Sequence, residues 1–111
     1  MNEDNNTMQG LMMAMYMEAA LDEFDTLPSE AVRDIALYTA QRLEQNDVTG
    51  GTTGLTIPQL PGRTFDGYQF FAYFYAATAT AFPEKTAMLN PQFELSLKAA
   101  QMRRRNKKSK S

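Results

Sequence analysis

The sequence predicts an all-α protein, a small four-helix bundle-like domain. Apolar residues recur at three- and four-residue spacing in several segments, which is the period of a helix. Prolines and short polar residues stand at the boundaries of these segments, where helices begin and end. Four of the six glycines fall in one segment, residues 46–64. With 111 residues, the chain has the size of one domain with a modest core.

The first helix is predicted over residues 7–24, after a flexible N-terminus of residues 1–6. The segment is rich in Met, Leu, Ala and Glu, which favour helices. Its apolar residues make a broad face around Met13 and Met17, and Glu18, Asp22 and Asp25 gather on the polar side.

A second helix is predicted from Pro28 to about Gln45. Proline suits the first turn of a helix, and Val32, Ile35 and Ala36 share one face. Because the break after the first helix is short, we expect the two helices to form an antiparallel hairpin.

Residues 46–64 are predicted to be a long Gly/Pro loop, because their four glycines and two prolines exclude a helix. We expect residues 55–57, Leu-Thr-Ile, to dock on the core as a short extended piece. Residues 57–63 also fit a polyproline-type ligand, but a docked turn is the favoured interpretation.

A third helix is predicted from Asp66 to Phe82, with Thr64 or Asp66 as its cap and Pro83 ending it. Aromatic residues, among them Tyr68 and Tyr75, point in every direction around it. A helix that is apolar all round is buried on all sides. We therefore expect this segment to be the central helix of the bundle, with more apolar surface than one small domain can cover, which suits a subunit interface.

The fourth helix is predicted to begin at Pro91, capped by Asn90, with the arginines from 103 at its C-terminal end and a disordered Lys/Ser tail from Asn106. One apolar row holds Phe93, Leu97 and Ala100, and a second row holds Leu95, Ala99 and Met102. Residues 7–102 form the predicted helical domain, and residues 103–111 form a basic tail.

Two missing residue types limit the chemistry. The chain has no cysteine and no histidine, which excludes thiolate nucleophiles, imidazole bases and cysteine- or histidine-ligated metal sites. The acidic cluster of the first helix lacks a second carboxylate motif, so we interpret it as a solvated face. We expect a non-enzymatic protein with no cofactor and no metal.

Charge is divided sharply along the chain. Residues 1–100 hold five basic and all thirteen acidic residues, a formal charge of −8, whereas residues 101–111 hold six basic residues, a charge of +6; together they give the net −2 of the chain. Such a cluster can neutralise phosphates without reading sequence. The predicted DNA- or RNA-binding residues are Arg103, Arg104, Arg105, Lys107, Lys108 and Lys110. The alternatives are a solubilising tail, a tail folded back on its own acidic body, or one that contacts acidic membranes or proteins.

A partner interface is predicted on the methionine-rich and aromatic helices, because methionine and aromatic side chains adapt to and anchor protein contacts. Its residues are Met12, Met13, Met17, Tyr68, Phe71 and Tyr75. A core role for the same residues is the competing interpretation.

The functional hypothesis is a non-enzymatic assembly or adaptor protein, oligomeric or docked in a larger nucleoprotein complex such as a virion. The alternative is a small regulatory module that binds one protein partner. The N-terminus lacks the positive start of a secretory signal, and the longest uncharged run, 67–83, is short for a membrane span. We expect a cytoplasmic or particle-bound protein that is neither secreted nor in a membrane.

Overall fold

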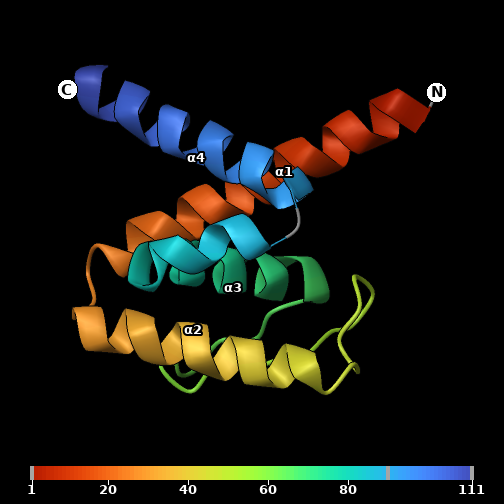
Figure 1. Ribbon diagram of the computed structural model, residues 1–111, viewed down its shortest axis with the longest axis vertical. Helices are drawn as coiled ribbons and strands as arrows, with labels where there is room; N and C mark the ends of the chain where they lie inside the picture. The colour runs from red at the N-terminus through yellow and green to blue at the C-terminus, as the bar shows by residue number, and fades with distance from the viewer. Residues whose placement is uncertain (1, 90, 111) are drawn as a thin grey trace.

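A computed structural model describes residues 2–89 and 91–110. In these residues the chain forms four α-helices and one 3-10 helix (Figure 1). They are α1 (Asn2–Phe24), α2 (Ser29–Glu44), α3 (Gly67–Ala81), η1 (Pro83–Met88) and α4 (Pro91–Lys110). The predicted all-α fold is confirmed, and so are the positions of the second and third helices.

The helices stack in the order α2, α3, α1 and α4. The strongest packing contacts are those of α3 with α2, of α4 with α1, and of α1 with α3. In Figure 1, α1 and α2 run in opposite directions, with α3 between them. The predicted hairpin is therefore right in direction but wrong in packing, because Ile35 and the other apolar residues of α2 are buried towards α3.

The aromatic helix α3 is the core of the molecule, as predicted. It begins with a capping box: the Gln69 backbone N–H donates to the Asp66 carboxylate at 2.8 Å, and the Asp66 N–H donates to the Gln69 side chain at 3.1 Å. Phe70 and Tyr75 are fully buried. Pro83 ends α3, but it also opens η1, which the sequence did not predict.

The long loop is docked on the core. Leu55 and Phe65 pair through two backbone hydrogen bonds of 3.0 and 2.8 Å, and the Leu60 N–H donates to the Ile57 carbonyl at 2.9 Å. All four side chains are buried. The docked turn is confirmed: the Leu60–Ile57 hydrogen bond closes a turn, whereas a polyproline helix has no internal hydrogen bonds.

Both end helices are longer than predicted. Helix α1 starts at Asn2 instead of residue 7, and α4 continues to Lys110 through the segment from Asn106 that was expected to be disordered. Residues 103–110 are therefore the last turns of a helix and not a structureless tail. The proposed cap Asn90 lies outside the described residues.

Candidate functional site

Helices α1 and α4 pack against each other and cross, running in the same general direction (Figure 1). The Ser96 hydroxyl of α4 donates to the Gly10 carbonyl of α1 at 3.2 Å near one end, and Arg104 bonds the Asp25 carboxylate near the other. Phe93, Leu97 and Ala100, the first apolar row of α4, are at least partly buried. This packing places the basic end of α4 over the acidic end of α1.

The opposite charges of the two helices form a set of ion pairs that we call the charged clasp. Arg103 Nε lies 3.2 Å from each Glu18 oxygen, and Lys107 Nζ lies 3.6 Å from Glu18 and 3.9 Å from Asp22. Arg104 Nε donates to Asp22 at 2.8 Å, and its terminal nitrogen pairs with Asp25. The clasp consists of Glu18, Asp22, Asp25, Arg103, Arg104 and Lys107.

Glu18 is the buried centre of the clasp. Its side chain is only 8% exposed, whereas Asp22 and Asp25 are 51% and 60% exposed. A carboxylate removed from water needs charged partners, which here are Arg103 and Lys107. The arrangement explains why the end of α4 is held on α1.

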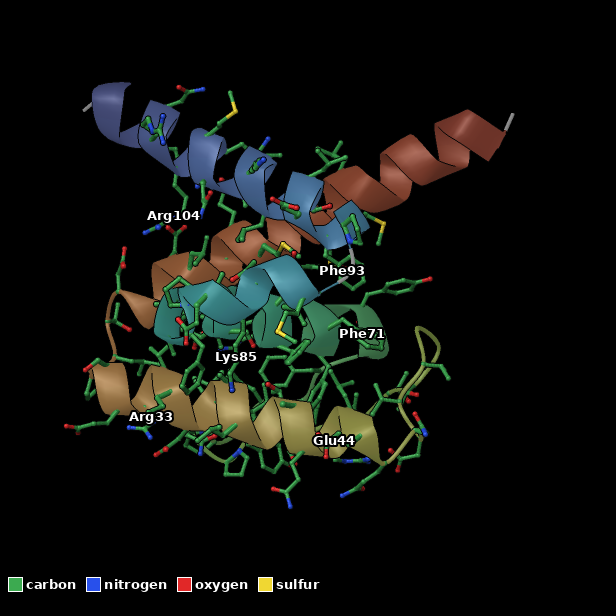
Figure 2. The ribbon with its side chains drawn as sticks, in the orientation of Figure 1. Arg33, Glu44, Phe71, Lys85, Phe93 and Arg104 are labelled. Atoms are coloured by element: carbon green, nitrogen blue, oxygen red, sulfur yellow. The ribbon has the colours of Figure 1, made fainter. Side chains whose placement is uncertain are left out.

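Arg104 is the most enclosed cation of the clasp, with 17% of its side chain exposed. Figure 2 shows it directed from α4 towards α1. The hydrogen bond to Asp22 raises the pKa of the Arg104 guanidinium, so this group keeps its charge.

The predicted nucleic-acid-binding residues are only partly available. Arg103, Arg104 and Lys107 pair with three carboxylates of the same chain, so their formal charges cancel. Arg105 is exposed, and the side chains of Lys108 and Lys110 lie outside the described residues. For the three paired cations, the structure agrees with a tail that folds back on its own acidic body.

Half of the predicted partner interface belongs to the core instead. Met13, Met17 and Tyr75 are at most 5% exposed, so they are not available to a partner of this folded chain. Phe71 is partly buried and packs against Phe93 of α4, with ring centroids 6.3 Å apart (Figure 2). The aromatic surplus of α3 is thus partly covered by α4.

Met12 and Tyr68 remain exposed, as the interface prediction requires. They are 43% and 40% exposed and, with Met13 and Tyr16, line an apolar hollow of about 170 Å³. A hollow of this size can accept one apolar side chain of a partner.

The outer row of α4 is the clearest apolar surface. Leu95 is 70% exposed, Met102 is 59% exposed, and Ala99 between them is exposed as well. Their spacing of four and three residues is that of a helix–helix seam. Leu11 and Met15 of α1 add two half-exposed apolar side chains.

A polar cluster that the sequence did not predict ties the loop to the core. Arg63 pairs with Glu23 and donates to the Tyr73 hydroxyl at 3.0 Å, while this hydroxyl donates to Glu23 at 2.7 Å. Burial raises the pKa of Tyr73, and the Glu23 hydrogen bond raises the pKa of Arg63. These residues are 10 to 50 positions apart, so no local pattern could reveal the cluster.

In residues 2–89 and 91–110, no three acidic, histidine or cysteine residues are grouped as a metal site would need. No described helix combines the length and apolarity required to cross a membrane. Comparisons of the chain with models of protein families, with curated proteins and with solved structures found no match.

Proposed function

We propose that this protein is a non-enzymatic helical assembly protein that associates with further copies of itself inside a larger nucleoprotein complex. A virion or a similar particle, or a cytoplasmic complex, is the proposed setting. The observation that carries the proposal is the exposed row Leu95, Ala99 and Met102 on the outermost helix. An apolar seam on an edge helix favours burial against another helix.

The exposed apolar side chains of α1 support a second copy as the occupant of this row. The row lies on a helix whose last turns are strongly basic, and α1 presents half-exposed Leu11 and Met15 on an acidic helix. Within one chain, the same two helices already attract each other through the charged clasp. Because the clasp already uses those charges, the α1 helix of a second copy offers the row its two half-exposed apolar side chains, Leu11 and Met15.

Nucleic-acid contact through the end of α4 is the second part of the proposal. Arg103 and Lys107 are 47% and 62% exposed, so a phosphate can approach them from the solvent side. The contact would be independent of sequence, because it rests on phosphate charge alone.

A regulatory module is the alternative function. The observation that favours it is the hollow lined by Met12, Met13, Tyr16 and Tyr68, which suits a single anchoring side chain of a protein partner. This surface lies on α1 and α3 and does not use the outer row of α4.

Light scattering coupled to size exclusion tests the assembly proposal. We expect a defined multiple of 12.5 kDa for the native chain, and a return to 12.5 kDa for a variant with Leu95→Glu and Met102→Glu. The matched control, Leu37→Glu with Met88→Glu, places the same charges on other exposed apolar positions and should keep the native mass. A native chain of 12.5 kDa, or equal effects of both variants, would overturn the proposal.

A further inference from the structure

We propose that Glu18, Asp22 and Asp25 of α1 act as an intramolecular competitor that closes the basic end of α4 to nucleic acid. The inference rests on the proposed nucleic-acid contact and adds its regulation. Carboxylate and phosphate are both oxygen anions that bind arginine through charge-assisted hydrogen bonds. Arg104 is 17% exposed and is held by both Asp22 and Asp25, so a phosphate can bind it only by displacing a carboxylate of the clasp.

Displacement has a different cost at each position. Asp22 and Asp25 are more than half exposed, so water solvates them once Arg104 leaves. Glu18 is 8% exposed, and it would become a buried charge without its arginine. We infer that Arg104 is released most readily and that Arg103 stays bound to Glu18.

Because the cations differ in how readily they leave their carboxylates, they become available to nucleic acid one after another. The solvent-exposed sides of Arg103 and Lys107 are the first groups that a nucleic acid meets. Arg104 joins the contact only when phosphate outcompetes its two aspartates. Nucleic-acid binding by the native chain is therefore weaker than the six basic residues of its last turns would allow.

The test measures binding of the full chain to a short fluorescent DNA duplex of random sequence, by anisotropy over a range of salt concentrations. In the variant with Asp22→Asn and Asp25→Asn, Arg104 loses both anionic partners while the amides preserve the size of the side chains. One added phosphate contact should tighten binding by about five- to tenfold at roughly 0.1 M salt, and should steepen the slope of log K against log salt by about 0.9.

Two matched variants assign the effect. Asp34→Asn with Glu44→Gln removes the same two charges from exposed positions on α2, and it should leave the salt slope unchanged. Adding Arg104→Gln to the Asp22→Asn and Asp25→Asn variant should return the slope to the native value. Circular dichroism confirms that each variant is folded.

The outcomes separate the inference from the function on which it rests. Native binding with no gain in the Asp22→Asn and Asp25→Asn variant, or an equal gain in the α2 control, would overturn the competition and leave the nucleic-acid contact standing. Absence of salt-dependent binding in every variant would overturn the contact itself, and the competition with it.

Discussion

Among the six glycines, Gly67 is the position where the fold leaves the least room for a side chain. It opens α3, and its N–H donates to the Thr52 carbonyl at 2.8 Å. A Cβ placed on Gly67 would lie 1.7 Å from the Thr49 carbonyl oxygen and 2.7 Å from its carbon. Ordinary contacts between such atoms are about 3.5 Å, so Gly67→Ala requires the loop backbone to retreat by roughly 2 Å.

We expect Gly67→Ala to lower the free energy of unfolding by about 3 kcal/mol. Overpacking against a backbone costs about 1–3 kcal/mol, and loss of the Thr52 hydrogen bond costs about 1 kcal/mol more. The melting temperature should fall by more than about 10 °C, given a shift of roughly 4–8 °C per kcal/mol in a small domain.

Urea and thermal unfolding followed by circular dichroism measure this loss. Gly51→Ala is the control, because a Cβ there meets only the Thr49 hydroxyl at 3.9 Å and should cost less than about 0.5 kcal/mol. If Gly67→Ala were as stable as Gly51→Ala, the close approach of the loop to α3 would be refuted.

Three other substitutions have definite expected signs in the same unfolding assays. Gly10→Ala should stabilise the protein by about 0.5–1 kcal/mol, because its Cβ finds space 4.0 Å from Ser96 in the middle of α1; a loss of stability would contradict the α1–α4 packing. Tyr73→Phe should lower the free energy of unfolding by about 1–3 kcal/mol, because it removes the hydroxyl that joins Arg63 to Glu23. Tyr75→Phe should be neutral or stabilising, because the Tyr75 hydroxyl is buried without a hydrogen-bond partner among the described residues. Equal losses of stability in the two variants would be inconsistent with the polar cluster. Burial raises the folded-state pKa of Tyr73 above its ordinary 10.0. The stabilisation linked to its proton is therefore fully present below pH 10.0 and is lost as pH rises through the raised pKa. In a tyrosine absorbance titration, the Tyr73→Phe variant should lack one of the groups that titrate late.

Local signals in the sequence were sufficient to predict where the helices lie along the chain, but not which helices pack against each other. The spacing of Val32, Ile35 and Ala36 predicts α2, and Asp66 followed by Gln69 at the third position is a capping box. An apolar row does not specify which surface covers it. Helices α1 and α2 were therefore expected to pack on each other, whereas both pack on the aromatic surface of α3.

The sequence showed the parts of the candidate site as two separate clusters of opposite charge, an acidic cluster on the first helix and a basic cluster at the end of the chain. Composition cannot show that these charges meet in the fold, because the paired residues are 79 to 89 positions apart along the chain. The pairing of Arg103, Arg104 and Lys107 with α1 holds this part of α4 on the domain, where the isolated sequence indicates a polar tail. Met13 and Met17 were ambiguous between core and interface for a similar reason, since burial depends on what α3 places opposite them.

The ion pairs between α1 and α4 are tested most directly by a double-mutant cycle on Glu18 and Arg103. Urea unfolding of Glu18→Gln, Arg103→Gln and the double variant should give a coupling free energy of at least about 1 kcal/mol, because Glu18 is buried. The exposed Glu94–Lys98 pair within α4, 3.6 Å apart, is the reference and should give about 0.3–0.5 kcal/mol. A Glu18–Arg103 coupling no larger than this reference would contradict the charged clasp and the competition that it implies.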